Sequence, residues 1–237
     1  MNDRDTPAAA DHESRLARSW RTNASAWTRA VREQRIASRR AGTDAAVLDA
    51  VLATGARRVL DAGCGEGWLA RALAAKGLDV VGVDASAELI AAANELGGAR
   101  FAVAGYADLD DRHAQLGRFD AIACNFALLG EDLQEPLRAL GRRLEPEGRL
   151  VVQTVHPWTA CGDAPYVDGW RVETFAGFGD QFREPMPWYF RTLASWLAAF
   201  AASGYAVERV AEPVDAASGR PLSLLLQAAL QSEGRRR

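Results

Sequence analysis

Cysteine is scarce in this sequence of 237 residues, and its three copies follow no recognisable ligand spacing. Cys64, Cys124 and Cys161 form an odd set without a C-x-x-C pair, which argues against both a disulfide framework and a metal site. No metal is therefore predicted. Reduced thiols of this kind fit a reducing compartment, and the predicted location is cytoplasmic.

Long apolar runs are missing as well. No stretch approaches the 18 uninterrupted apolar residues that a membrane span needs, and the acidic opening MNDRDTPAAADHES lacks the apolar centre of a signal peptide. Lysine occurs only at Lys76, and the formal net charge is −3. This charge argues against a polyanion as the main partner. Neither a membrane nor a nucleic acid is predicted as a partner.

Short apolar segments alternate with helical patterns along most of the chain. Strands are predicted at RRVLDAG, DVVGVDAS, ARFAVAGY, RFDAIACNFALL and RLVVQTVHP, and the helix SAELIAAANELGG has Ser86 as its N-cap. This alternation indicates an α/β fold, with a parallel sheet covered by helices on both faces. After the helix FRTLASWLAAFAASG, the strands YAVERVAEPV and PLSLLLQAAL are too close for another crossover, which predicts an antiparallel final strand.

The remaining segments suggest how the chain is divided. Residues 1–13 are expected to be a disordered tail, and residues 14–54 an N-terminal helical lid with a break near RRAGTD. An α/β domain then covers 55–237. Within it, residues 156–190 interrupt the alternation and hold nine of the chain's 19 aromatic residues. We expect this aromatic-rich insertion to fold over the carboxyl edge of the sheet.

The turn after the first strand, VLDAGCGEGW, has glycines at positions 63, 65 and 67. A dinucleotide site needs G-x-G-x-x-G, whose third glycine lets helix and strand pack closely, but Trp68 occupies that place here. Asp61 precedes the glycines, where a carboxylate would repel a pyrophosphate and attract an ammonium group. Asp84 ends the second strand and can accept hydrogen bonds from ribose hydroxyls. These residues favour a cationic ligand without phosphate.

Four motifs together resemble the class I S-adenosylmethionine-dependent methyltransferases. VLDAGCGEG and VVGVDAS resemble the first two motifs, RFDAIACNFALL resembles the strand-four motif, and LEPEGRLVVQTVHP resembles the one around strand five, with Glu147 in place of a glycine. The resemblance implies a Rossmann-like methyltransferase fold, a mostly parallel seven-stranded sheet in the order 3-2-1-4-5-7-6. NASAWTRAVREQRIASRR, HPW and MPWYFRTLASWL resemble bacterial small-molecule methyltransferases, distantly like the quinone-pathway enzymes.

The same resemblance implies S-adenosylmethionine as the cofactor and S-adenosylhomocysteine as the product. Asp61 would contact the methionine end and Asp84 the ribose. Tyr106 stands where the family often has an acidic residue for the adenine amino group, so the Ala107 backbone is expected to bind adenine. Asn125 would lie beside the transferred methyl, although it could instead cap a turn. The predicted cofactor site comprises Asp61, Ala62, Gly63, Cys64, Gly65, Gly67, Asp84, Ala85, Leu89, Tyr106, Ala107, Asn125 and Phe126.

Methyl transfer from a sulfonium is an in-line displacement, so the site must align the nucleophile and exclude water. His156 follows the fifth strand directly and is the predicted catalytic base, because imidazole titrates near neutral pH. The alternative is that it only hydrogen-bonds a loop. The predicted acceptor-binding residues, some of which could equally be core of the insertion, are Trp27, Arg32, Trp158, Tyr166, Trp170, Trp188 and Tyr189.

The predicted function is methyl transfer to an O-, N- or C-nucleophile of a small molecule, by a monomer or a homodimer. Two alternatives stay open. The arginine-rich segment 14–40 is either the solvated face of a docking helix or the landing surface of an RNA or protein methyltransferase. Against the latter stand the acidic net charge and CNFALL in place of the N/D-P-P-Y/F motif of base methylators. The chain could also bind S-adenosylmethionine without catalysis, as a sensor.

Overall fold

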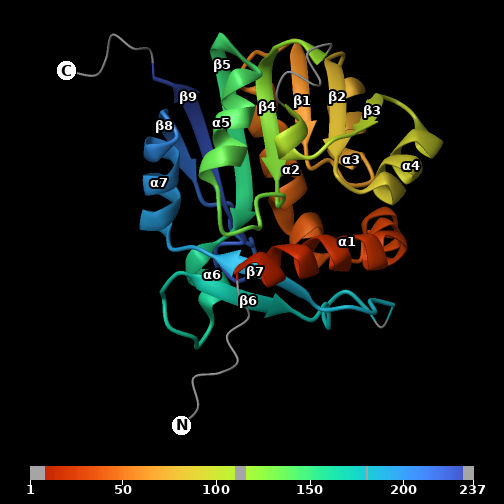
Figure 1. Ribbon diagram of the computed structural model, residues 1–237, viewed down its shortest axis with the longest axis vertical. Helices are drawn as coiled ribbons and strands as arrows, with labels where there is room; N and C mark the ends of the chain where they lie inside the picture. The colour runs from red at the N-terminus through yellow and green to blue at the C-terminus, as the bar shows by residue number, and fades with distance from the viewer. Residues whose placement is uncertain (1–8, 110–115, 180, 232–237) are drawn as a thin grey trace.

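A seven-stranded sheet forms the centre of the computed structural model, which describes residues 9–109, 116–179 and 181–231 (Figure 1). Its strand order is β3-β2-β1-β4-β5-β9-β8. The parallel strands are β1 (Arg58–Ala62), β2 (Asp79–Asp84), β3 (Arg100–Val103), β4 (Phe119–Asn125) and β5 (Leu144–Val155). β9 (Ser223–Leu230) runs antiparallel to β5 and to β8 (Tyr205–Ala211). The predicted fold class and strand order are confirmed.

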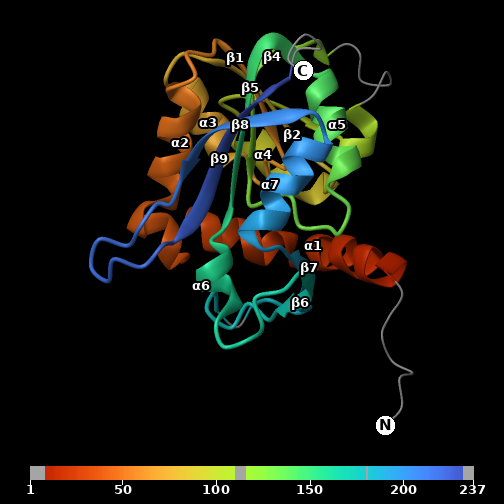
Figure 2. The same ribbon diagram turned by 90° about the vertical axis from the view of Figure 1, so that its left-hand side faces the viewer.

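Helices cover both faces of the sheet, as Figure 2 shows. The strands alternate their side chains between the two faces. Val59 and Ala121 pack with α2 (Asp44–Leu52) and α3 (Trp68–Ala74). Leu60 and Ile122 belong to the core on the side of α5 (Gln134–Arg142) and α7 (Leu193–Ala202). α4 (Ala87–Leu96) lies against β2 and β3, and the short turn η2 (Tyr106–Leu109) follows β3. None of the described helices is long and apolar enough to cross a bilayer.

The N-terminal segment differs from the prediction at its start. The tail expected at residues 1–13 is wrong from Ala9 onward, because α1 (Ala9–Arg32) begins there; residues 1–8 lie outside the described part. The break predicted near RRAGTD is confirmed, because Gly42 (φ +149°) kinks the chain within η1 (Arg39–Thr43), which leads into α2. A second turn, not predicted, follows Arg32, with Gln34 at φ +54°, so that Ile36 packs back on the end of α1.

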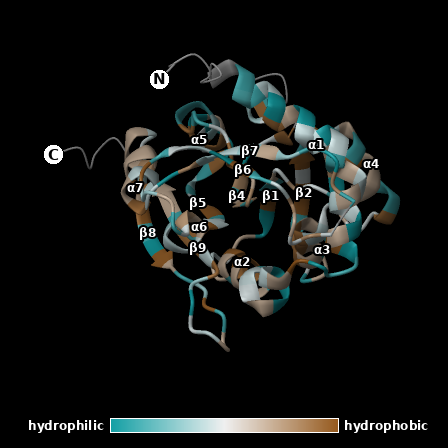
Figure 3. Ribbon diagram, turned by 90° about the horizontal axis from the view of Figure 1, so that it is seen from below, coloured by the Kyte–Doolittle hydropathy of each residue, from teal (hydrophilic) through white to brown (hydrophobic). Residues whose placement is uncertain are grey.

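The aromatic-rich segment contributes a short helix and a separate two-stranded sheet. α6 (Pro157–Cys161) follows β5, and β6 (Gly169–Glu173) pairs antiparallel with β7 (Met186–Phe190). α1 runs across the end of the central sheet and lies against β7 (Figures 1 and 3). We call α1 together with β6 and β7 the cover.

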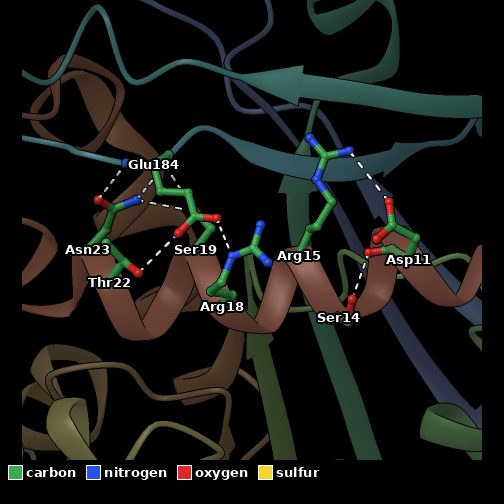
Figure 4. A network of polar contacts seen from close by, with 8 residues as sticks. All are labelled: Asp11, Ser14, Arg15, Arg18, Ser19, Thr22, Asn23 and Glu184. Atoms are coloured by element: carbon green, nitrogen blue, oxygen red, sulfur yellow. Dashed lines mark hydrogen bonds and ion pairs between the residues drawn. The ribbon is translucent and has the colours of Figure 1, made fainter. Parts of the chain in front are cut away.

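A polar network joins the two halves of the cover (Figure 4). The buried Asn23 of α1 accepts a hydrogen bond from the Arg183 backbone amide (2.9 Å) and donates one to the Glu184 carbonyl (2.6 Å). The Glu184 carboxylate in turn accepts from Arg18 (2.6 Å) and Thr22 (3.1 Å). An Asn side chain has both a donor and an acceptor, so it can pair with an extended backbone as a neighbouring strand would.

We expect Asn23→Ala to loosen the cover, because the Arg183 amide loses its acceptor. Leaving a buried polar group unsatisfied costs about 1–3 kcal/mol. Hydrogen–deuterium exchange of the amides of residues 11–32 should accelerate, and the free energy of unfolding in urea should fall. Ser25→Ala, at an exposed position of the same helix, is the matched control. Equal exchange rates in the two variants would contradict a joining role for Asn23.

Candidate active site

The loop after β1 approaches its neighbours more closely than a side chain would allow. Gly63 has φ +77°, and a Cβ atom there would lie 2.4 Å from the Cβ of Ala127. The backbone amides of Gly63 and Cys64 donate to the Val83 carbonyl of β2 (2.8 and 3.0 Å). Gly67 starts α3 at φ +85°, where a Cβ would collide with the Phe101 ring. The glycines therefore permit a narrow turn at the carboxyl edge of the sheet.

Asp84 ties this loop to the loop after β2. One carboxylate oxygen accepts from the Gly65 amide (2.9 Å) and the other from the Ser86 amide (2.8 Å). Ser86 then caps α4 by accepting from the Leu89 amide (3.2 Å), as predicted. Burial raises the pKa of Asp84, while the two backbone donors oppose the rise. Each oxygen keeps a lone pair for a further donor.

Asp61, at the end of β1, is 1% exposed, and its Oδ2 has no hydrogen-bond partner within the described residues. Burial raises the pKa of Asp61 to about 7, and the charges of Asp84 and Glu66 add to the rise. Glu66 is equally buried, but Arg71 (2.5 Å) and Arg32 (3.4 Å) neutralise it. Asp61 is thus an uncompensated buried carboxylate of the kind that a cationic ligand stabilises.

These loops and the cover enclose one cavity of about 370 Å³. It lies where the strand order reverses between β1 and β4, the usual ligand position in open α/β sheets. The structure brings most of the predicted cofactor residues to its wall, namely Asp61, Gly63, Cys64, Gly65, Asp84, Ala85, Leu89, Tyr106, Asn125 and Phe126. Ala62, Gly67 and Ala107 do not line it. Ala62 faces the core beneath the loop, and Gly67 serves the packing of α3.

The end of β4 supplies the middle of the cavity wall. Phe126 lies in the left-handed region at φ +53°, a conformation that a bulky residue keeps only where its surroundings enforce it. Its amide donates to the Gln153 carbonyl (2.7 Å), and Asn125 accepts from the Gln153 side chain (2.8 Å). Tyr106 reaches across to donate to the Ala127 carbonyl (3.3 Å). The side chains on β4 and β5 are therefore fixed rather than free to adapt.

The alternation of side chains along β7 determines which of its aromatic residues face the cavity. Successive side chains of a strand point to opposite faces. Trp188 lines the cavity, together with Met186 on the same face and Glu173 opposite Met186 on β6. Tyr189, one residue later, faces away and pairs with Trp170 across the strands. The predicted acceptor contacts of Trp170 and Tyr189 are thus wrong.

Trp158 and Tyr166, which were also predicted to bind the acceptor, lie outside the cavity for another reason, because neither is on β7. Trp158 is 69% exposed on α6, and the Tyr166 hydroxyl accepts a hydrogen bond from the Leu193 amide (2.9 Å). Both rings lie in a separate aromatic group with Phe190. They hold the loop between α6 and β6 against the start of α7 and do not line the cavity.

Trp27 and Arg32, the two acceptor-binding residues predicted on the N-terminal helix, lie on different sides of α1. Trp27 lines the cavity. Arg32 points to the other side of the helix, where it bonds the Ala92 carbonyl (2.8 Å) and pairs with Glu66 and Glu95 (3.4 Å each). Arg32 therefore docks α1 onto α4, and its predicted contact with a ligand is wrong.

His156 does not line the cavity either, although Thr154 and Val155 do. Its ring is buried, and Nε2 lies 2.7 Å from a carboxylate oxygen of Glu212, beyond β8. The chain turns into α6 at this residue, which directs the side chain away from the strand ends. This placement contradicts the predicted role of His156 as the base and matches the alternative of a hydrogen bond to a loop.

Several residues that line the cavity on the side of the cover, which we call the acceptor side, were not predicted from the sequence. These are Trp20, Arg21, Glu173, Phe175, Phe178 and Met186. The spacing of some of these residues in the sequence could have indicated them. Trp20 and Trp27 are seven residues apart and so share one face of α1, and Met186 and Trp188 share one face of β7.

A family model described as a methyltransferase domain matches residues 6–210. The chain belongs to this family. An uncharacterized methyltransferase of Schizosaccharomyces pombe is 29% identical over 64% of this chain and 60% of its own length. The chain therefore spans less than two thirds of that relative.

Solved structures agree with the assignment. An S-adenosylmethionine-dependent methyltransferase from Mesorhizobium loti is 28% identical over 73% of this chain and 90% of its own, with a TM-score of 0.54. A Burkholderia thailandensis 1,6-didemethyltoxoflavin N1-methyltransferase shares the fold with a TM-score of 0.65, at 22% identity over 96% of this chain and 93% of its own.

At the level of the family, these comparisons confirm the predicted methyltransferase activity and its S-adenosylmethionine cofactor. The predicted likeness to quinone-pathway enzymes is weak. A Xanthomonas oryzae ubiquinone biosynthesis O-methyltransferase matches only 42% of the chain, at 35% identity.

The raised pKa of Asp61 predicts how the stability of this methyltransferase depends on pH. Protonated Asp61 contributes stability that is fully present below its usual pKa of 3.8 and is lost as the pH rises to about 7. Between pH 5 and pH 8, the wild type should therefore lose stability relative to Asp61→Asn, measured by urea unfolding without ligand. Asp163→Asn, an exposed position on the loop before β6, controls for the lost charge. Parallel pH profiles of wild type and Asp61→Asn would contradict the assignment.

Proposed function

We propose that this protein transfers a methyl group from S-adenosylmethionine to a small-molecule acceptor held beneath the cover. One observation carries the proposal. A single cavity joins a carboxylate-lined end at the loops after β1 and β2 to an aromatic end formed by α1, β6 and β7. A cavity of this size, mostly apolar with a few convergent polar groups, is typical of a small-molecule site.

The residues present fit S-adenosylmethionine. The unpartnered Oδ2 of Asp61 suits the ammonium group of its methionine part, and the free lone pairs of Asp84 suit the ribose hydroxyls. Ala85 and Leu89 offer apolar contact for adenine. The cofactor supplies an electrophilic methyl group on a sulfonium. The protein's part is to orient it, to exclude water, and to hold the acceptor in line.

A macromolecular acceptor is less compatible with the surface of α1. Three of its arginines already have partners within the protein: Arg18 pairs with Glu184, Arg29 with Gln181, and Arg32 with Glu66 and Glu95. The cover also occupies the approach that an RNA or peptide would need. We keep a monomer or homodimer and a cytoplasmic location as part of the proposal.

Asp84→Ala should weaken binding of S-adenosylmethionine by about 1.5–3 kcal/mol, the range for a hydrogen bond to a charged group. Isothermal titration calorimetry measures this directly. Asp79→Ala, at the exposed opposite end of the same strand, should leave the affinity unchanged. An unchanged affinity in Asp84→Ala would remove Asp84 from the cofactor site.

The acceptor class is tested by incubating the protein with methyl-labelled S-adenosylmethionine and cell extract, then separating metabolites, RNA and protein. We expect the label in the metabolite fraction. Label in RNA or protein would instead support a macromolecular acceptor. Cofactor binding without any label transfer would favour the sensor alternative.

A further inference from the structure

We propose that the acceptor is an arylalkylamine, an alkyl amine that carries an aromatic ring, which enters as a cation, with its ammonium group bound by Glu173 among aromatic side chains. The inference rests on the proposed function and specifies its substrate class. The amine would be N-methylated.

Glu173 is a fixed carboxylate on the inner face of the cover. It ends β6 opposite the buried Met186, and one of its oxygens accepts a hydrogen bond from the Phe175 amide (2.6 Å). The side chain is half-buried and lines the cavity. Within the described part of the chain, no ion pair joins it to a cationic side chain. The carboxylate is therefore available to a cationic group that enters the cavity.

Aromatic rings line the same cavity as this carboxylate. Trp20 and Trp27 of α1 meet edge to face at 5.2 Å between centroids, and Phe178 lies 6.1 Å from Trp27. Trp188 lies on the same face of the cover. The faces of such rings attract cations, most strongly when water is excluded. Rings and carboxylate together thus select a flat molecule with a positive charge.

The other charges of the cavity point the same way. Arg39 lines it, but both carboxylate oxygens of Asp44 hold its Nε (2.8 and 3.0 Å), and its guanidinium lies over Trp68. Arg21 also lines the cavity, but from an exposed position on α1, where water and salt screen its charge. The carboxylates of Glu173 and Asp61 attract an ammonium group and repel an acidic acceptor.

The reaction balances without another reagent. The ammonium group gives a proton to the Glu173 carboxylate, which frees the nitrogen lone pair. That pair forms the bond from nitrogen to the methyl carbon as the bond from carbon to sulfur breaks, and the breaking pair stays on sulfur. The products are the methylated ammonium ion, neutral thioether sulfur in S-adenosylhomocysteine, and a proton that leaves Glu173 for solvent.

The first test measures binding rather than turnover. Calorimetry on the protein saturated with S-adenosylhomocysteine would compare tryptamine with 3-ethylindole and indole-3-acetate, and tyramine with 4-ethylphenol and 4-hydroxyphenylacetate. We expect at least one amine to bind about tenfold more tightly than its neutral partner, and the acids to bind most weakly. Glu173→Gln should remove this preference. It retains an acceptor for the Phe175 amide, so the unfolding midpoint should stay unchanged. Asp163→Asn, an exposed acid of the loop before β6, should keep the preference.

The second test uses the labelled products from cell extract. After chromatographic removal of unreacted S-adenosylmethionine, which is itself a cation, we expect the remaining methyl label to be retained on a cation exchanger at pH 7, and Glu173→Gln to lower its amount at least tenfold. A neutral or anionic labelled product, or equal binding of amine and neutral probes, would overturn the substrate class while leaving methyl transfer intact. Failure of S-adenosylhomocysteine to bind at all would instead overturn the proposed function.

Discussion

The site depends on keeping carboxylates buried at the carboxyl edge of a parallel sheet. Asp61 and Asp84 lie at the carboxyl ends of neighbouring strands, so the sheet fixes their separation. Both oxygens of Asp84 accept hydrogen bonds from backbone amides, whereas Oδ2 of Asp61 has no partner within the described residues. The free protein therefore carries an unfavourable electrostatic arrangement, which a ligand with a positive charge relieves. The binding site for such a ligand is therefore preorganised in the free protein.

The cover completes this arrangement by excluding water, and polar contacts hold it in place. Segments about 160 residues apart, α1 and the chain before β7, meet through the amide of Asn23 and the carboxylate of Glu184. Apolar contacts of Leu16 and Trp20 with Phe175 and Met186 add to these hydrogen bonds. A cavity that must admit both a cofactor and an acceptor benefits from a cover that excludes water.

The fold and the cofactor edge could be predicted from the sequence because both are local. A strand, a glycine turn and a carboxylate at the next strand end fix one another within about 25 residues, as Gly63 and Asp84 show. The acceptor side could not be predicted in this way. Trp188 and Tyr189 are adjacent aromatics, and only the register of β7 separates them. To predict where the Arg32 side chain points, one would need to know how α1 is rotated about its axis. For His156, one would need the direction that the chain takes after β5. Each depends on tertiary packing that residue type does not encode.

The alternation of β7 also gives the cover two different faces. One face presents Met186 and Trp188 to the cavity, and the other carries Pro187 and Tyr189 away from it. The connection before β7 lies in a segment far from the glycine turn in sequence. A shift of one residue in that connection would turn the strand over and place a phenol and a proline ring where an indole and a thioether now stand. Descendants of this fold can thus acquire a new acceptor surface through a change in loop length alone, with every cofactor residue left untouched.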